Sequence, residues 1–193
     1  MSIITLVSGG LDSSLMSLLI SESKLEQFPL FINYGQLSFE MEWNACKKFH
    51  SNFKLPTPEL IDIKGYGQFF PCGITNKNKE IKKEAFLPNR NALFLLIGCS
   101  YAFIKKSDSI AIGLLNENTH LFPDQTDIFL NKFEDSFELS LGRRINIITP
   151  LREFYKKDIV DLAKSKGIYG TYSCHRGAAI PCGKCISCEE FQF

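Results

Sequence analysis

Short apolar runs alternate along this chain with longer segments of helical periodicity, and this alternation constrains the fold more than any other feature. The short runs predict strands at Ile3 to Val7, Pro29 to Tyr34, Glu59 to Ile63, Ser109 to Leu115 and Ile145 to Thr149. The longer segments predict helices over Leu11 to Leu19, Leu37 to Phe53, Arg90 to Lys105, Asp124 to Leu141 and Lys156 to Lys166. Strands joined by right-handed helical crossovers pair in parallel. We therefore predict an α/β fold, a doubly wound parallel sheet of about five strands.

Two segments depart from this alternation. Gly65 to Pro88 carries Gly, Pro and a Lys-rich middle, which predicts a long mobile loop rather than packed structure. The residues from Thr171 onward also lack the pattern and predict a small C-terminal appendage. We therefore expect an α/β domain over residues 1–170 and a separate segment over residues 171–193.

Composition and charge exclude several classes of protein. The 193 residues are 45% hydrophobic, which excludes a disordered chain. A formal net charge of +1 excludes a whole-molecule field that would hold the protein on nucleic acid or an anionic membrane. The longest apolar run, Ala92 to Ile104, is shorter than the ~20 residues of a membrane span. The N-terminal residues have no basic segment ahead of an apolar stretch, so we do not expect them to form a signal peptide. We expect a soluble cytoplasmic protein with no membrane partner.

The first predicted strand ends in a loop with the sequence Ser-Gly-Gly-Leu-Asp-Ser-Ser. Ligands of open α/β sheets bind beyond the carboxyl ends of the strands, where this loop lies. Adjacent glycines let the backbone approach an anion, and the N–H groups of the following helix donate to it. Asp12 can hold Mg²⁺ or a ligand hydroxyl. The alternative is that the loop is only a tight turn, in which Asp12 and Ser13 cap the helix. The residues of this candidate phosphate-binding loop are Ser8, Gly9, Gly10, Leu11, Asp12, Ser13 and Ser14.

Four of the seven cysteines lie close together near the C-terminus, at Cys174, Cys182, Cys185 and Cys188. In a reducing compartment such a cluster indicates a metal site rather than disulfides. Two consecutive C-x₂-C steps direct three thiolates at one point, and the preceding loop brings Cys174 back as the fourth ligand. We predict a closed, structural Zn²⁺ site, with an iron–sulfur cluster as the alternative. The other three, Cys46, Cys72 and Cys99, are predicted to be unpaired thiols without a chemical role.

The loop at one end and the cysteines at the other carry a family resemblance. The loop resembles the PP-loop of the ATP pyrophosphatases, and the whole chain is similar to the QueC family, the 7-cyano-7-deazaguanine synthases. The other motifs that carry the resemblance are Leu87 to Phe94, Gly113 with Phe122-Pro123-Asp124, Thr149-Pro150-Leu151 with Lys156, and Thr171 to Cys174 followed by Pro181 to Cys185. The resemblance implies an adenine nucleotide alpha hydrolase-like (PP-loop) fold and a homodimer.

The same resemblance implies a reaction and roles for individual residues. ATP, with Mg²⁺, would adenylate the carboxylate of 7-carboxy-7-deazaguanine, ammonia would displace AMP, and a second activation would dehydrate the amide to the nitrile. The implied catalytic residues are Asp12, Arg90 and Lys156, the implied ATP-binding residues are Ser8 to Ser14, and the implied substrate-binding residues are Asn89, Arg90, Asn91, Phe122 and Asp124.

Some segments depart from the family pattern. After Pro123-Asp124 the family usually continues with Cys-Arg, where this chain has Gln125 and Thr126. One alternative is therefore a diverged QueC-like enzyme that joins the activated acid to another amine, such as a protein N-terminus in antiphage defence.

Two further alternatives concern nucleic acids. A tRNA-thiolating PP-loop enzyme would need a cysteine pair near the active face, where Cys72 is the one loop candidate outside the C-terminal cluster. A zinc-knuckle nucleic-acid-binding module would rely on Arg176 and Lys184, the only basic residues near the knuckle.

Overall fold

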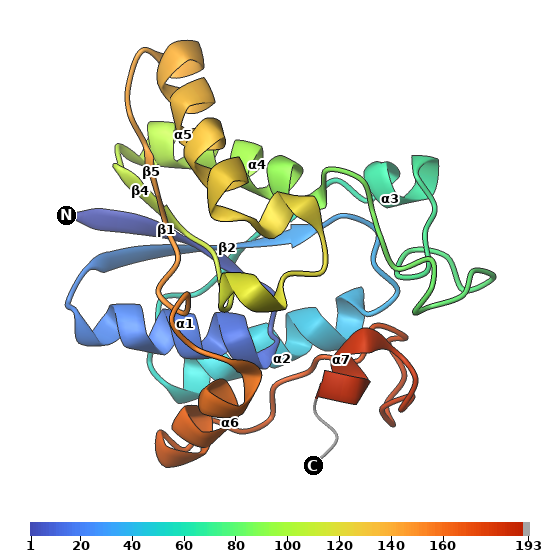
Figure 1. The fold of residues 1–193 in the computed structure, drawn as a ribbon. Helices are drawn as coiled ribbons and strands as arrows, with labels where there is room; N and C mark the ends of the chain where they lie inside the picture. The colour runs from blue at the N-terminus through green and yellow to red at the C-terminus, as the bar shows by residue number, and fades with distance from the viewer. Residues whose placement is uncertain (191–193) are drawn as a thin grey trace.

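The computed structural model describes residues 1–190, which form an α/β sandwich around a five-stranded parallel sheet (Figure 1). The strands are β1 (Ser2–Val7), β2 (Glu26–Asn33), β3 (Glu59–Asp62), β4 (Ser109–Ala111) and β5 (Asn146–Ile148), in the order β3-β2-β1-β4-β5. In the central register, Ile4 of β1 pairs with Phe28 of β2 and with Ile110 of β4. The predicted fold class is confirmed.

Helices cover both faces of this sheet (Figure 1). One face carries α4 (Arg90–Lys105) and α5 (Asp127–Leu141), and the other carries α1 (Leu11–Glu22), α2 (Phe39–Asn52) and α6 (Lys156–Ser165). The core under α4 and α5 includes Ile4, Leu30, Leu95, Ile110 and Phe137, and the opposite core includes Ile3, Leu15, Met16, Ala111 and Ile159. Successive side chains of β1 enter opposite cores, which explains why this strand is apolar on both faces.

The strand order places a ligand crevice beside β1. The chain builds β2 and β3 on one side of β1 and then crosses to build β4 and β5 on the other. This topological switch point opens a crevice beyond the carboxyl ends of β1 and β4. The loop after β4 meets the first turn of α1 there, because a Cβ placed on Gly113 would lie 3.4 Å from the backbone nitrogen of Ser13.

The segment from Gly65 to Pro88 contains packed structure, so the prediction that it is unpacked is wrong. It begins with a short helix, α3 (Gly65–Phe69), and its backbone then folds back so that the N–H of Gly73 donates to the carbonyl of Glu84 at 2.6 Å. A small satellite core forms from Cys72, Ile74, Ala85 and Leu87 against Tyr34 at the end of β2. These apolar residues have no helical or strand period, so the sequence pattern does not reveal their burial.

The predicted helix from Asp124 to Leu141 is interrupted near its start. A 3₁₀ turn, η2 (Pro123–Gln125), comes first, and Thr126 is extended (ψ 154°). The Thr126 hydroxyl accepts a hydrogen bond from the backbone N–H of Phe129 at 3.3 Å, so it caps α5. The remaining short elements are η1 (Glu117–Thr119) and α7 (Ile186–Glu190).

The C-terminal segment lies against the α/β body. The N–H of Tyr172 donates to the carbonyl of Gly9 at 2.9 Å, and Arg176 donates to the carbonyl of Lys77 at 3.2 Å. A domain boundary at residue 170 stays a prediction, and residues 191–193 lie outside the described residues.

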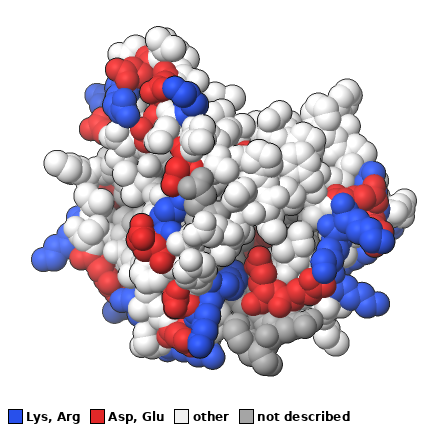
Figure 2. All heavy atoms as spheres, viewed as in Figure 1, with Lys and Arg blue, Asp and Glu red and all other residues white. Residues whose placement is uncertain are grey.

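The described surface carries charges of both signs, in line with the formal net charge of +1 (Figure 2). Basic and acidic side chains are intermixed on the face in Figure 2, which is hollowed near its centre. Within residues 1–190, no helix combines the length and the apolar character needed to span a bilayer.

Candidate active site

Hydrogen bonds of its own serines fix the shape of the loop between β1 and α1. The Ser13 hydroxyl accepts from the N–H of Ser8 at 3.1 Å and donates to the carbonyl of Gly10 at 3.2 Å. The Ser8 and Ser13 hydroxyls lie 3.1 Å apart, and the Ser14 N–H bonds back to Gly10 in the first turn of α1. The loop therefore curves around the N-terminus of α1, which favours an anion.

The two glycines of this loop have different roles. Gly9 has φ +76°, and a Cβ there would collide with the backbone of α2, including the nitrogen of Cys46 at 2.9 Å. Gly10 has an ordinary extended conformation (φ −78°, ψ 167°), and a Cβ there would make normal contacts, 3.4 Å from the Ser8 hydroxyl. Backbone geometry requires glycine at position 9, whereas position 10 only needs to leave room for a ligand.

Asp12 and Lys156 form an ion pair in the crevice. Lys156, at the first turn of α6, donates to both carboxylate oxygens of Asp12 at 2.9 Å, although 144 residues separate them. The Glu190 carboxylate lies 3.5 Å from the same Lys156 ammonium group. Burial raises the pKa of Glu190, and the positive charge of Lys156 partly offsets this rise. Two of the three predicted catalytic residues are thus in direct contact.

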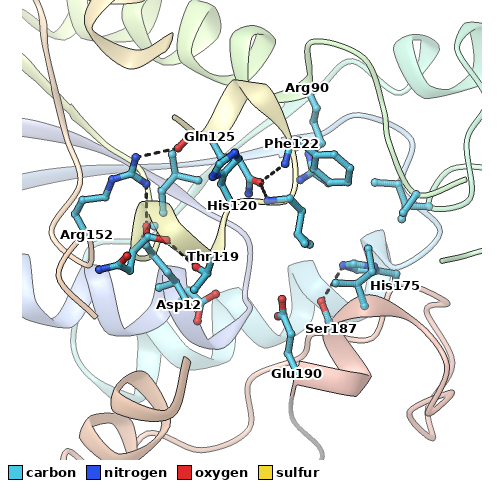
Figure 3. Close-up of a pocket in the computed structure, with 18 residues that line it drawn as sticks. Asp12, Arg90, Thr119, His120, Phe122, Gln125, Arg152, His175, Ser187 and Glu190 are labelled. Carbon is cyan, nitrogen blue, oxygen red and sulfur yellow. Dashed lines mark hydrogen bonds between the residues drawn. The ribbon is translucent and has the colours of Figure 1, made fainter. Parts of the chain in front are cut away.

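Three cavities meet around Asp12. The phosphate cavity, about 130 Å³, is lined by Ser8, Gly10 to Ser13, Lys156, Ser173 and Glu190. The sheet cavity, about 280 Å³, is lined by the ends of β1, β2 and β4 together with Glu42, Arg90, Asn91 and Phe94. The outer cavity, about 180 Å³, is lined by Arg90, Asn116, His120, Phe122, Gln125 and Ser187 among others (Figure 3). Asp12 and His175 line all three.

Arg90 borders both the sheet cavity and the outer cavity from the N-terminal end of α4. Its guanidinium is a planar fork that suits a phosphate or carboxylate. Tyr34 lies nearby, and burial raises the pKa of its phenol to about 12, although Arg90 opposes that shift. Arg90 is the third predicted catalytic residue, so the structure brings all three to one set of connected cavities.

The other predicted substrate residues divide into two groups. Asn91 lines the sheet cavity and Phe122 lines the outer cavity, with its ring centroid 4.9 Å from that of Phe86. Asn89 and Asp124 are not among the residues that line these three cavities. Asp124 instead accepts from the N–H of Asn91 at 3.0 Å and caps the first turn of α4. Substrate binding by Asn89 and Asp124 stays a prediction.

Gln125, where the chain departs from the family pattern, uses its side chain locally. Its amide oxygen accepts from the N–H groups of Leu121 at 2.8 Å and Phe122 at 2.9 Å. Arg152 joins the same wall, because it donates to the carbonyls of Leu115 at 2.8 Å and Gln125 at 3.1 Å. Gln125 therefore shapes the wall of the outer cavity.

Two residues that line the cavities, Glu42 and His175, were not predicted to be functional from the sequence. Glu42 on α2 lines the sheet and phosphate cavities, and its carboxylate accepts from Ser38 at 2.7 Å and Gln36 at 3.2 Å. Burial raises its pKa, which the two hydrogen bonds and Arg90 partly oppose. The sequence offers no signal for Glu42, because acidic residues near a helix start are common.

His175 is the second missed residue. Its Nε2 lies 2.9 Å from the Ser187 hydroxyl, and the ring faces the cavities (Figure 3). Burial, with a smaller contribution from Arg90, lowers its pKa to about 4.

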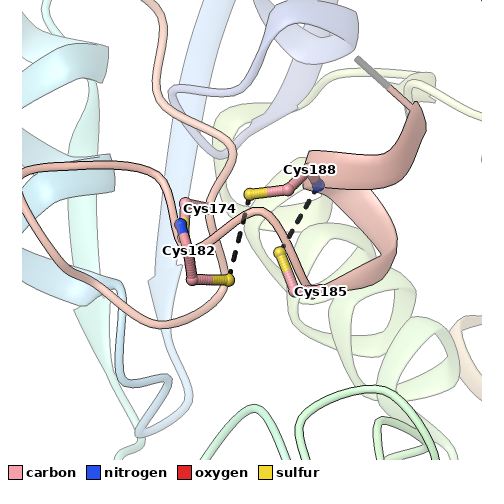
Figure 4. A group of neighbouring side chains, drawn as sticks. All are labelled: Cys174, Cys182, Cys185 and Cys188. Carbon is pink, nitrogen blue, oxygen red and sulfur yellow. Dashed lines mark hydrogen bonds between the residues drawn. The ribbon is translucent and has the colours of Figure 1, made fainter. Parts of the chain in front are cut away.

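The four clustered cysteines come together as predicted. Their sulfur atoms all lie within 4.8 Å of one another, and the side chains of Cys182, Cys185 and Cys188 point toward one another in Figure 4. Burial raises the pKa of the Cys182 thiol, but hydrogen bonds from the backbone of Lys184 and Cys185 outweigh that effect and bring the pKa to about 7. The group can hold a metal ion.

The three remaining cysteines are buried. Burial raises the pKa of Cys46 to about 12 and that of Cys99 to about 11, so both thiols stay protonated near neutral pH. Cys72 belongs to the satellite core beneath Tyr34, and none of the three lines the cavities described above.

Relatives of the chain share its whole length. The 7-cyano-7-deazaguanine synthase of Methanosarcina mazei is 27% identical over 210 residues, covering 97% of this chain and 90% of its own. That of a Nitratiruptor species is 30% identical over 201 residues, covering 98% and 91%. That of Prochlorococcus marinus is 31% identical over 206 residues, covering 97% and 90%.

Solved structures support the fold class. An NMN synthetase from Francisella tularensis superposes with a TM-score of 0.57 at 16% identity, covering 97% of this chain and 71% of that chain. The U34-tRNA thiolase NcsA of Methanococcus maripaludis superposes with a TM-score of 0.56 at 16% identity, covering 93% and 61%. At these identities the likeness concerns the fold alone. Residues 2–192 match the family model of the queuosine biosynthesis protein QueC, and with the relatives above this match shows that the chain belongs to the QueC family.

Proposed function

We propose that this protein uses ATP to adenylate the carboxylate of 7-carboxy-7-deazaguanine and converts the acid through its amide to 7-cyano-7-deazaguanine. The relatives that share its length carry the name of this synthase. The single observation that carries the proposal is the meeting of three cavities at Asp12, beside a phosphate-type loop. One cavity suits the departing pyrophosphate, and the other two suit a nucleoside and a second planar ligand.

Each of the three cavities can be assigned to one part of the ligands. We assign the β- and γ-phosphates to the phosphate cavity, where loop N–H groups and Lys156 supply positive charge. We assign adenosine to the sheet cavity, which is larger and lined by apolar ends of strands. The acid then occupies the outer cavity, with its carboxylate near Arg90.

A carboxylate is a poor electrophile, so the reaction first makes one of its oxygens part of an AMP leaving group. A carboxylate oxygen attacks the α-phosphorus, the bond to the bridging oxygen breaks, and pyrophosphate leaves. Ammonia then attacks the acyl carbon, loses a proton, and displaces AMP. The amide oxygen attacks a second ATP in the same way, and loss of both N–H protons with departure of AMP leaves the nitrile. Arg90 and Lys156 are positioned to stabilise negative charge on the phosphates.

Asp12 has a double role in this proposal. It orients Lys156 through the two 2.9 Å contacts, and its carboxylate oxygens suit a hard divalent cation. When bound there, Mg²⁺ would neutralise charge on the pyrophosphate leaving group.

For the cysteine cluster we propose structural zinc. A tetrahedral ion with ~2.3 Å zinc–sulfur bonds places its sulfurs ~3.8 Å apart, close to the observed spacing within 4.8 Å. In a [4Fe–4S] cluster each thiolate binds a different iron, and in a [2Fe–2S] cluster two thiolates bind each of two irons, so in both the four cysteine sulfurs spread farther apart than around a single ion. Four protein ligands leave no open position for a substrate, which favours a structural role.

The nucleic-acid alternatives have less support. A thiolating enzyme needs a reactive thiol at the active face, whereas Cys46, Cys72 and Cys99 are buried and do not line the three cavities. A nucleic-acid-binding module needs a basic surface, whereas the face in Figure 2 mixes both charges.

We also propose a homodimer formed through the outer sides of α4 and α5. These helices leave large apolar side chains exposed at Leu96, Phe103, Ile104, Ile128 and Leu139. A molar mass near 44 kDa, twice the 21.9 kDa of one chain, is the expected result of light scattering. A mass near 22 kDa would contradict the dimer.

Release of pyrophosphate tests the proposed function. The protein should release pyrophosphate from ATP when 7-carboxy-7-deazaguanine is present, and Asp12→Asn should abolish that release. Asp161→Asn, on the exposed side of α6, is the matched control and should keep wild-type activity. No acid-dependent pyrophosphate from the wild-type protein would refute the proposal.

A further inference from the structure

The inference concerns His175, which the C-terminal segment places where the three cavities meet. Its imidazole lines the phosphate, sheet and outer cavities, a position shared with Asp12. Nε2 lies 2.9 Å from the Ser187 hydroxyl on α7 (Figure 3). Nδ1 is buried, and within the described part of the chain it has no hydrogen-bond partner. One ring nitrogen is therefore fixed by the protein and the other is unsatisfied.

An unsatisfied buried nitrogen beside a cavity points to a ligand. Buried polar atoms in proteins are almost always hydrogen-bonded, so each exception calls for a specific reason. Within residues 1–190, buried side-chain oxygens on Thr5, Ser17 and Gln27 also lack hydrogen-bond partners, and the Tyr101 hydroxyl lies near Glu59 and Lys105. None of these residues lines the three cavities, whereas His175 lines all of them.

The Ser187 hydroxyl can donate to Nε2 or accept from it at 2.9 Å, and the direction of this bond sets what Nδ1 offers. When the hydroxyl donates to Nε2, the ring proton resides on Nδ1, so this atom is a hydrogen-bond donor. A donor in a cavity shared with Arg90 matches an anionic oxygen better than a ring nitrogen or an apolar group.

The position within the site identifies that oxygen. Under the proposed function, pyrophosphate, adenosine and the acid occupy three different cavities. The α-phosphate is the one group that is bonded to or attacked by all three. A residue that borders every cavity therefore lies where the α-phosphate lies.

We propose that His175 donates a hydrogen bond from Nδ1 to a non-bridging oxygen of the nucleotide α-phosphate, and that Ser187 is a positioning residue that orients the ring. This assignment rests on the proposed function. It also gives the C-terminal segment a part in the active site, since both residues lie among the clustered cysteines.

Three variants test the assignment. His175→Phe keeps a planar ring and removes both nitrogens, whereas His175→Asn retains an amide N–H near the Nδ1 position. We expect His175→Phe to lower kcat/KM for ATP by about 10- to 100-fold, the usual range for a hydrogen bond to a charged group. His175→Asn should recover most of that loss. Ser187→Ala should lower kcat/KM in the wild-type background and have no further effect in the His175→Phe background.

The readouts are pyrophosphate release, the dissociation constant for ATP, and the melting temperature of each variant. If His175→Phe had the same kcat/KM and the same affinity for ATP as the wild-type protein, the assignment would be overturned. It would also be overturned if His175→Asn lost as much kcat/KM as His175→Phe. A wild-type protein that binds ATP but releases no pyrophosphate with the acid would refute the proposed function alone. In that case the tenfold or greater loss of ATP affinity expected for His175→Phe still decides the role of His175.

Discussion

Replacing Gly9 by alanine should destabilise the fold, whereas the same change at Gly10 should leave it folded. Gly9 has φ +76°, and the left-handed region costs an L-residue about 1–2 kcal/mol. The new methyl group would also press on the backbone of α2 near Glu42 and Cys46, and overpacking of this kind costs about 1–3 kcal/mol. The two terms together predict a loss of about 2–5 kcal/mol, a large part of the ~5–15 kcal/mol of a typical domain.

Gly10→Ala is the matched control. Gly10 already has an extended conformation that alanine adopts freely, and its Cβ would make ordinary contacts. The expected cost is about 1 kcal/mol, because alanine is a poorer N-cap than glycine. Its methyl group would enter the phosphate cavity, so this variant should fold but bind ATP weakly.

Urea unfolding followed by fluorescence measures both effects. The single tryptophan, Trp43, is a suitable probe, because it lies on α2 with its ring centroid 5.1 Å from that of Phe31. Gly9→Ala should lower the urea midpoint by about 1 M or more, given a slope of ~1–3 kcal/mol per M. A Gly9→Ala midpoint equal to that of Gly10→Ala would refute the reasoning about backbone geometry.

Three further predictions address the metal site, a buried histidine and a helix cap. Cys185→Ser should bind less than one metal ion per chain and melt at a lower temperature, because a structural metal contributes to folding; an unchanged melting temperature would contradict this. Burial lowers the pKa of His50 below 6.5, so the stabilising effect of its neutral ring is present above pH 6.5 and is lost as the pH falls. Between about pH 8 and about pH 5.5 the wild type should therefore lose more unfolding free energy than His50→Asn, which keeps a donor for the Pro56 carbonyl that His50 bonds at 2.7 Å; equal losses would contradict the assignment. Asp124→Ala should lower the unfolding free energy by about 0.5–2 kcal/mol, since it removes the cap on α4, and unchanged stability would contradict a capping role.

The parallel sheet and the phosphate-type loop were predictable from the sequence for a physical reason. Each strand of a doubly wound sheet is buried on both faces, so β1 and β2 appear as short apolar runs between helical segments. The loop after β1 is local in sequence, so its glycines and serines could be recognised without knowledge of the rest of the fold. The cysteine cluster was predictable because ligand spacing within a short segment is itself a geometric constraint.

The parts that were missed depend on contacts between distant segments. Ile74 and Leu87 become buried only when the chain folds back against Tyr34, and no periodic pattern marks them. His175 reaches the cavities because the C-terminal segment lies across the phosphate loop, and the sequence does not encode that placement in any local motif.

The most direct test of the central claim follows the oxygen atoms of the acid. The protein is incubated with ATP, ammonium and 7-carboxy-7-deazaguanine labelled with ¹⁸O in its carboxylate, and the products are analysed by mass spectrometry. Activation of the carboxylate and then of the amide at the α-phosphate predicts two molecules of AMP, each with one ¹⁸O atom, for every nitrile formed. Unlabelled AMP, or ADP in place of AMP, would contradict the account.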